Sequence, residues 1–317
     1  MIYWGINALN HGSSLAVFNN GQLIFNSVDN TRDNPHNLIS DAMLRGWEPD
    51  HIFWYENPWV KKARQIKAGQ YKTAFRLDNL PKHYLKKWGL GHAPVTYTPH
   101  HASHAAAGYY TSPFNHCAVV VLDAIGEFDC ATIWEAKHGE MRKVWSRSYP
   151  HSLGLFYSAF TQFVGLTPIR DEHLLQKMAE QGNPFNFRPI VADYFDSGVV
   201  ELNHNLHRGV LNWPDNQLET LQEQCDLAAA VQERFEIEVG KVMALARTLT
   251  KADCLVYMGG CAMNSQANRL EVEPLFKYRW SLPNPGDASS SIGAVAYHTR
   301  QRINSDMGTV KHIDIHV

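Results

Sequence analysis

The chain has 317 residues, of which 44% are hydrophobic and 19% charged, and its formal net charge is -2. A chain of this length and composition can bury a large core without disulfide or metal staples, as soluble globular proteins do. Its near-neutral charge provides no global positive field, which argues against a nucleic-acid partner or an anionic membrane surface.

The first third of the chain predicts three strands followed by mixed helices and strands. Apolar runs separated by turn residues predict short strands at residues 2–6, 15–18 and 22–25. Apolar spacing after them predicts a helix, a strand and two further helices, at residues 38–44, 51–55, 59–75 and 101–110.

The remainder of the chain begins with a similar order. The continuous apolar run at residues 117–122 is typical of a strand buried on both faces, and it ends at Asp123. Two hairpin strands are expected next, at residues 130–135 and 141–145. The other expected elements are a strand at 254–258 and helices at 153–163, 226–249 and 289–298. Residues 183–222 are rich in Asn, Pro and Asp and predict an irregular insertion.

The repeated order predicts the fold class. Strand, turn, strand, strand and helix occur near residue 1 and again near residue 117, as a duplicated ribonuclease-H-like α/β fold would produce. We expect two halves, residues 1–115 and 116–317, that face one another across a nucleotide cleft.

Cysteine usage and the N-terminal residues indicate the compartment. The cysteines form no CxxC pair and several adjoin strand-like residues, which is typical of buried free thiols in a reducing environment. The chain begins without a basic signal-like segment and has no apolar run long enough to span a bilayer. We therefore expect a cytoplasmic protein without a membrane partner.

One dense basic stretch lies in a helix-like segment that also contains Ala and Gln. Its members are Lys61, Lys62, Arg64, Lys67, Lys72 and Arg76. The favoured interpretation is a solvated helix face. A rim that attracts an anionic substrate is the alternative.

A histidine-rich segment gives the strongest single indication of chemistry. On a helix, His100 and His104 project on one face, so both imidazoles can reach one metal ion, whereas His101 points elsewhere. No Glu follows the first histidine to act as a base, which excludes the zincin pattern. Surface or capping histidines are the alternative interpretation.

Asp123 lies where a buried strand ends, the position at which open α/β sheets place functional groups. The turn after it, through Gly126, has the form of a phosphate- or metal-facing turn, and an ordinary turn aspartate is the alternative. Gly259 and Gly260 also follow a strand, and their backbone N–H groups can approach a nucleotide there, although tight strand-to-helix packing also needs glycine.

Two further polar residues lie in turns. Asp287 precedes a helix of small residues, where capping is the default expectation and projection into the cleft is the alternative. His11 lies in the first hairpin turn, which faces the phosphates in nucleotide-binding halves. A plain hairpin loop is the other interpretation of this turn.

Together these segments resemble the antibiotic and nodulation-factor O-carbamoyltransferase family, whose amino-terminal domain is related to the tRNA threonylcarbamoyltransferases and the actin/hexokinase group. The matching segments run in order along essentially the whole chain and include HHASHAAAGYYTSPF, GGCAMN and GDASSSIGA. They cover residues 5–7, 11–14, 32, 36, 55–58, 100–114, 122–123, 126–127, 152–166, 226–232, 259–264 and 286–294. The resemblance implies an actin/hexokinase-type fold around a nucleotide and metal cleft.

The resemblance also implies roles for individual residues. The divalent-metal ligands would be His100, His104, Asp123 and Asp287. This mixed donor set suits iron, which we favour, and also manganese or zinc. The metal would orient the phosphate of a carbamoyl-adenylate, with His11 beside the reacting group as the base. The adenosine and phosphate would contact Gly259, Gly260, Asn264, Asp123 and Gly126.

Three departures from the family pattern bear on these roles. The first turn reads His11-Gly12-Ser13 where the family has HDS, so a carboxylate is missing. Residues 172–179, EHLLQKMA, lack a family lysine at its expected place. Full-length relatives continue into a domain that makes carbamoyl-adenylate from ATP and carbamoyl phosphate. We expect this chain to lack that domain and to depend on a separate adenylate-forming partner.

The sequence thus predicts a metal-dependent carbamoyltransferase that moves a carbamoyl group from carbamoyl-adenylate to a hydroxyl of a small-molecule acceptor. One alternative is an ATP-binding kinase or ATPase of the same fold, which would hold Mg²⁺ mainly through carboxylates and water. The other is a nucleotide-binding partner subunit without chemistry of its own.

Overall fold

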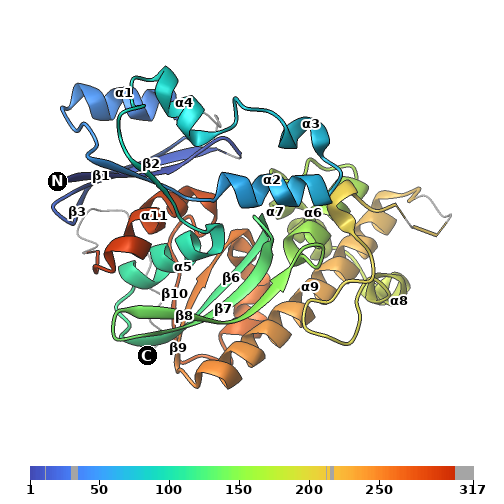
Figure 1. The fold of residues 1–317 in the computed structure, drawn as a ribbon. Coiled ribbons are helices and arrows are strands. Elements are labelled where there is room, and N and C mark those ends of the chain that lie inside the picture. The colour runs from blue at the N-terminus through green and yellow to red at the C-terminus, as the bar shows by residue number, and fades with distance from the viewer. Residues whose placement is uncertain (11, 30–34, 212, 215–217, 304–317) are drawn as a thin grey trace.

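Two five-stranded mixed sheets form the framework of the computed structural model, which describes residues 1–10, 12–29, 35–211, 213–214 and 218–303. The first sheet consists of β1 (Ile2–Asn7), β2 (Ser13–Asn19), β3 (Gln22–Asp29), β4 (His51–Trp54) and β5 (Val95–Tyr97). The second consists of β6 (His116–Gly126), β7 (Asp129–Lys137), β8 (Glu140–Ser148), β9 (Cys254–Met258) and β10 (Tyr278–Trp280). Figure 1 shows the two sheets with helices between and around them.

The two sheets repeat one strand order. They read β3-β2-β1-β4-β5 and β8-β7-β6-β9-β10. In each, the first three strands pair antiparallel as successive hairpins, and the last two run parallel to the first strand. This repetition confirms the predicted α/β class, a duplicated ribonuclease-H-like fold of the actin/hexokinase type.

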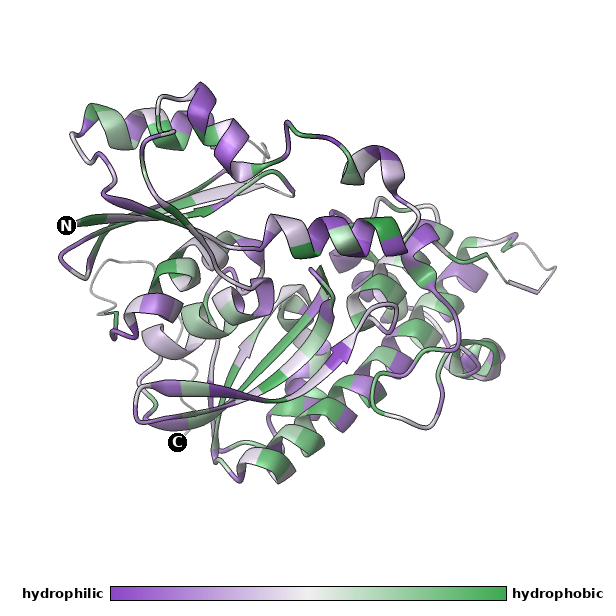
Figure 2. Ribbon diagram, in the orientation of Figure 1, coloured by the Kyte–Doolittle hydropathy of each residue, from purple (hydrophilic) through white to green (hydrophobic). Residues whose placement is uncertain are grey.

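Strand β6 is the centre of the second sheet. It pairs with β7 on one side and β9 on the other, and the apolar side chains of residues 117–122 are fully buried. Figure 2 shows the corresponding concentration of hydrophobic residues in the central strands. A bulge between Leu122 and Gly126 interrupts the pairing with β7. Because bulges redirect side chains, this irregularity sets the direction of Asp123, which lies within it.

Helices α5 (His100–Thr111) and α11 (Ser290–Thr299) join the two halves. Helix α5 packs on β6 and β9, α11 packs on β1 and β2, and the two helices pack closely on one another. A Cβ at Gly293 would overlap the carbonyl oxygen of Ser103, so only glycine allows this approach. The contact brings residues of the first helical turns of α5 beside the segment that leads into α11.

The helices of the first half differ in part from the predicted ones. The expected helix at residues 59–75 is two helices, α2 (Pro58–Lys67) and α3 (Tyr71–Ala74), because the chain turns at Gly69 with φ +72°. Helix α1 (His36–Leu44) matches the expectation closely. Helix α4 (Pro81–Lys87) was not predicted.

Helix α9 (Leu221–Thr250) is the longest described helix. It starts at a capping box formed by Thr220 and Glu223 and ends at Lys251, whose backbone is left-handed. Helices α6 (Leu153–Phe163) and α7 (Glu172–Ala179) pack on it, and α7 was not predicted. After β9 the chain forms η3 (Gly260–Met263), α10 (Ser265–Ala267), η4 (Asn268–Val272) and η5 (Asp287–Ser289).

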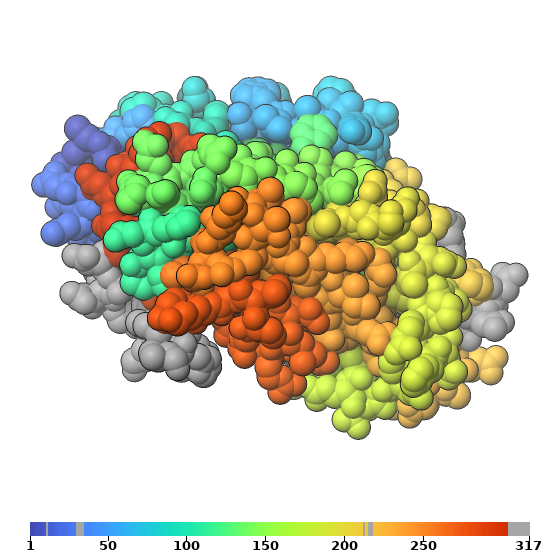
Figure 3. Space-filling view, turned by 90° about the horizontal axis from the view of Figure 1, so that it is seen from below, coloured from blue at the N-terminus to red at the C-terminus, as the bar shows by residue number. Residues whose placement is uncertain are grey.

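The segment expected to be an irregular insertion contains only short elements in its described part. They are η1 (Pro184–Asn186), α8 (Arg188–Ala192) and η2 (Leu206–Arg208). Elements η1 and α8 pack on α9, and Figure 3 shows the yellow insertion beside the orange residues of α9 and the following segments. The five cysteines are free, and all except Cys254 are buried. No helix of the described residues is both long and apolar enough to cross a membrane.

Candidate metal centre and adjoining pocket

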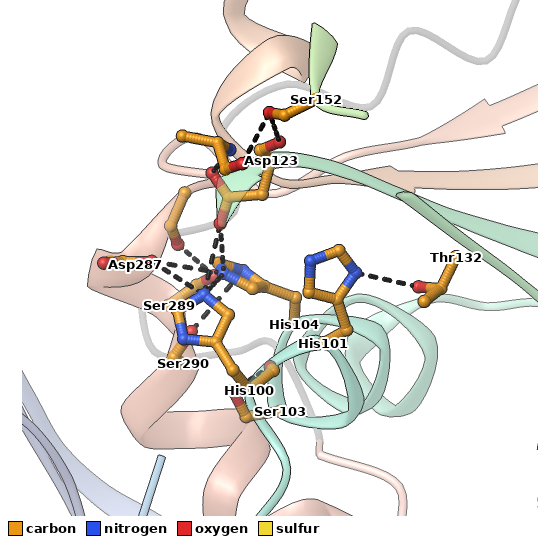
Figure 4. Close-up of polar contacts among 12 residues, drawn as sticks. His100, His101, Ser103, His104, Asp123, Thr132, Ser152, Asp287, Ser289 and Ser290 are labelled. Atoms are coloured by element: carbon orange, nitrogen blue, oxygen red, sulfur yellow. Dashed lines mark hydrogen bonds and ion pairs between the residues drawn. The ribbon is translucent and has the colours of Figure 1, made fainter. Parts of the chain in front are cut away.

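Four side chains predicted to act together meet in the structure (Figure 4). They are His100, His104, Asp123 and Asp287, and one donor atom from each lies within 4.8 Å of the others. Helix α5 supplies the two histidines, the bulge of β6 supplies Asp123, and η5 supplies Asp287. The duplicated fold therefore brings residues from three distant parts of the sequence to one point.

The spacing of the donor atoms suits a single ion. The two imidazole Nε2 atoms are 3.0 Å apart. Asp123 Oδ2 lies 3.2 Å from each of them, and Asp287 Oδ1 lies 3.3 Å from His100 and 3.2 Å from His104. In a tetrahedral site with bonds of about 2.1 Å, neighbouring ligand atoms are about 3.4 Å apart. The donor set and its dimensions thus fit a divalent transition metal.

Opposing electrostatic effects act on the buried histidines. Burial disfavours the charged form of His100, but the carboxylates of Asp287 and Asp123 outweigh it and hold its pKa well above the ordinary range. Burial also opposes charge on His104, and hydrogen bonds with the same carboxylates raise its pKa. Burial would raise the pKa of Asp123, yet its bonds with the two histidines hold that pKa well below the usual value. The carboxylates thus favour the protonated form of the imidazoles, and the imidazoles favour the ionised form of Asp123.

Other polar groups orient the cluster. Ser290 Oγ lies 3.4 Å from His104 Nδ1, on the ring edge that faces away from the cluster. The backbone N–H of Ala124 donates to Asp123 Oδ1 at 2.8 Å. His101 turns away, as predicted, and its Nδ1 lies 3.0 Å from the hydroxyl of Thr132. Such outer contacts fix ring orientation in metal sites.

The default expectation for Asp287 was wrong. The N-cap positions of η5 and α11 are occupied by Gly286 and Ser289. The carboxylate of Asp287 faces His100 and His104 instead.

The predicted glycines surround the cluster closely. Gly259 has φ +92°, and a Cβ there would overlap the carbonyl of Leu122, so close packing on β6 requires this glycine. An added Cβ at Gly260 would lie 3.3 Å from Asp123 Oδ1. A Cβ at Gly126 would overlap the imidazole of His100. These three glycines therefore make room for the cluster and its supporting strand.

Asn264 has a structural role in this arrangement. Its side chain is buried and exchanges hydrogen bonds of 2.9 and 3.0 Å with the amide of Gln232 on α9. Its Oδ1 also accepts from the backbone N–H of Ala267 at 3.0 Å, capping α10. The side-chain amide thus ties the GGCAMN segment to α9. His11, the remaining predicted residue, lies outside the described residues.

A pocket of about 430 Å³ adjoins the cluster. His100, Asp123 and Asp287 contribute to its lining, together with residues from α2, α6 and η2. Asn10 also lines it, so the first hairpin turn reaches the pocket. Its volume is in the range of small-molecule sites.

Two carboxylates at this pocket received no role from the sequence. Glu56 lies two residues after the end of β4 and forms a 2.6 Å ion pair with Lys61. Burial raises the pKa of Glu127 to about 7, and its Oε1 accepts from the backbone N–H of Asn57. Asp123 was indicated by its position at the carboxyl end of a parallel strand. Glu56 has a similar position, so this signal could have identified it as well.

The solvated-face interpretation of the basic stretch holds only in part. Lys67, Lys72 and Arg76 are exposed. Arg64 is buried, however, and both Arg64 and Lys61 line the pocket beside the cluster.

The protein is thus a duplicated α/β protein. It has a candidate metal centre of two histidines and two aspartates where its halves meet. Residues 34–296 match the family model described as carbamoyltransferase N-terminus. The chain therefore belongs to the carbamoyltransferase N-terminal family.

Relatives of this chain include characterised and uncharacterised proteins. An uncharacterized protein from Synechocystis is 28% identical over 92% of the chain and 55% of its own length. The nodulation protein NolO of Bradyrhizobium diazoefficiens is 26% identical over 62% of the chain and 37% of its length. The nodulation protein NolNO of Sinorhizobium fredii is 24% identical over 63% of the chain and 30% of its own length. The chain spans about half the length of the curated relatives it matches, or less.

Solved structures show more distant similarity. Component A of the Acidaminococcus fermentans (R)-2-hydroxyglutaryl-CoA dehydratase aligns with 95% of this chain and 99% of its own, at 11% identity and a TM-score of 0.48. A ROK family protein from Streptococcus pneumoniae in complex with sucrose aligns with 94% of this chain and 98% of its own, at 12% identity and a TM-score of 0.49. The fold assignment therefore rests on the strand order described above.

Proposed function

We propose that this protein is a metal-dependent carbamoyltransferase that moves a carbamoyl group from carbamoyl-adenylate to a hydroxyl of a small-molecule acceptor. The observation that supports this proposal is the convergence of two imidazoles and two carboxylates on the wall of a pocket, in a chain of the carbamoyltransferase family. A kinase that uses Mg²⁺ would gain little from two histidines, because Mg²⁺ prefers oxygen ligands.

The ligands in this proposal are His100, His104, Asp123 and Asp287. Iron is the favoured ion, and manganese and zinc suit the same donors. When bound, it would supply Lewis acidity toward the phosphate and the mixed anhydride of the donor. The protein's part is to hold the four donor atoms together, since α5 packs closely on α11, the helix that follows η5.

The rest of the site binds and orients the reactants. Gly260 leaves space beside Asp123 for the phosphate of the adenylate, and Gly126 leaves room for the imidazole of His100. Asn264 acts as a positioning residue, because its amide holds the GGCAMN segment on α9. We propose residues 1–115 and 116–317 as the two halves around this cleft.

The chemical step is a displacement at the carbamoyl carbon. The acceptor oxygen forms a bond to that carbon, the bond between the carbon and the phosphate oxygen breaks, and AMP leaves with the electron pair. His11 takes the hydroxyl proton in this proposal, and its neighbour Asn10 lines the pocket. Carbamoyl-adenylate is the donor that the family resemblance implies.

The test uses carbamoyl-adenylate labelled with an isotope in its carbamoyl group. Purified protein with a panel of alcohols should produce labelled carbamate ester and AMP, and Asp123→Asn should abolish both products. Lys72→Gln, an exposed change on α3, serves as the control. Transfer of phosphate from ATP without carbamoyl transfer would favour the kinase alternative. Nucleotide binding without either reaction would favour a non-catalytic subunit.

A further inference from the structure

A buried arginine that has no counter-ion among the described residues lies in the wall of the pocket. Arg64, on α2, is 8% exposed and lines the pocket next to the candidate metal centre. Its Nη1 donates to Gln70 Oε1 at 2.9 Å, whereas its Nε is buried without a hydrogen-bond partner. Among the described residues, Arg64 forms no ion pair. A buried charge without a counter-ion is costly, so this arrangement needs a physical reason.

The nearby carboxylates are engaged elsewhere. Glu56 pairs with Lys61 at 2.6 Å, and Glu127 accepts from the backbone of Asn57. The two aspartates of the cluster face His100 and His104. Burial lowers the pKa of Arg64, with Glu56 as the leading group that opposes this effect. Arg64 is therefore a cation of the pocket wall that forms no ion pair with any described residue.

The wall around Arg64 is ordered by hydrogen bonds. Gln70 accepts from Arg64 and also lies 3.1 Å from His207 Nε2, which joins α2 to η2 across the pocket. Gln65, 5% exposed, lines the same pocket, and its Oε1 is buried without a partner. The guanidinium is thus held in place, and two adjacent side chains retain unused hydrogen-bonding capacity.

We propose that Arg64 receives an anionic group, a phosphate or a carboxylate, of the acceptor molecule. A planar guanidinium suits these groups because it can donate two parallel hydrogen bonds. Gln65 Oε1 accepts from a hydroxyl of the same molecule. This inference rests on the proposed function, since it assigns the acceptor to the class of acidic hydroxyl compounds, such as sugar phosphates and sugar acids.

The arrangement gives the acceptor a fixed orientation. Its anionic end lies on α2, and its reacting hydroxyl points toward the candidate metal centre in the same pocket. A volume of about 430 Å³ is sufficient for a compound with one sugar ring. Recognition at Arg64 is therefore separate from the transfer chemistry, which allows each to be tested alone.

The test measures binding by calorimetry, without a carbamoyl donor and at constant ionic strength. The probes are glucose, glucose 6-phosphate, glucuronate and glucosamine, which share a hexose ring and differ in charge. We expect at least one anionic probe to bind about tenfold more tightly than glucose or glucosamine. The phosphate and the carboxylate probes distinguish the two anionic groups. Arg64→Gln should remove the preference, whereas Lys72→Gln should retain it.

Two results would overturn the inference. One is equal affinity of the native protein for glucose and both anionic probes. The other is an undiminished preference in folded Arg64→Gln, which would place the anion on the metal centre instead. If Arg64→Gln does not fold, Arg64→Lys should show a reduced preference for the anionic probes. The comparison of anionic and uncharged probes on the native protein also tests the inference. Anion preference without carbamoyl transfer would contradict the proposed function and leave Arg64 as an anion-binding residue whose ligand is not a carbamoyl acceptor.

Discussion

The Nε2 atoms of His100 and His104 face each other at 3.0 Å, each within 3.3 Å of a carboxylate oxygen from Asp123 and Asp287. If both imidazoles were neutral with the proton on Nδ1, their Nε2 lone pairs would face one another. Either a proton or a cation must lie between them. The state of this pair therefore depends on both pH and metal, and the following predictions use that dependence.

Metal binding should release protons and weaken as the pH falls. The carboxylates hold the pKa of His100 well above the ordinary value of 6.5, so protons compete for this imidazole from above that pH. A metal ion requires the neutral imidazole. For each displaced proton, affinity should fall about tenfold per pH unit, starting above pH 6.5. Calorimetry in two buffers of different ionisation enthalpy measures the release, and pH-independent affinity would contradict this assignment.

Ser290→Ala should weaken metal binding although Ser290 is not a ligand. Its hydroxyl lies 3.4 Å from His104 Nδ1 and orients that ring. Loss of such a contact should lower metal affinity by about tenfold. Ser291→Ala is the matched control, because Ser291 is also buried and its hydroxyl has no partner in the described structure. Equal affinities of the two variants in competitive chelator titrations would refute an orienting role for Ser290.

Gly293→Ala should reduce both stability and metal affinity. The added Cβ would overlap the carbonyl of Ser103, so α5 and α11 would have to separate. We expect the free energy of unfolding to fall by about 1–3 kcal/mol in denaturant titrations. The ligands on α5 would also move away from Asp287. Gly91→Ala, whose added Cβ would approach only Lys86, should leave both properties near the native values.

The repeated order of elements along the chain and three of the four cluster positions followed directly from residue patterns. The apolar run of β6 located Asp123, and helical spacing placed His100 and His104 on one face. Short edge strands such as β5 and β10 were missed, because three residues carry no measurable periodicity. Helices of seven or eight residues, such as α4 and α7, were missed for a similar reason.

Long-range contacts explain what the sequence could not indicate. Asp287 faces the histidines because α11 packs on α5, a contact between distant segments that no local pattern encodes. Arg64 resembles its exposed basic neighbours in sequence, yet it is buried and donates to Gln70, which lies outside α2. His207 lies in the irregular insertion, where no periodic pattern exists.

Gly260→Val should remove nucleotide-induced stabilisation. The proposed phosphate position lies beside Asp123, and a valine side chain at residue 260 would occupy this space, since even a Cβ would lie 3.3 Å from Asp123 Oδ1. AMP should raise the unfolding temperature of the native protein by mass action and should not raise that of the variant. Thermal unfolding with and without AMP measures this difference. Equal AMP-induced shifts would show that the GGCAMN segment only packs the fold.

The central claim is that His100, His104, Asp123 and Asp287 form one metal centre, and elemental analysis of purified protein tests it most directly. The native protein should contain about one equivalent of a divalent transition metal per chain, with iron favoured. The double variant His100→Ala/His104→Ala should contain almost none, while Lys72→Gln should match the native protein. A folded double variant with as much tightly bound metal as the native protein would contradict the claim.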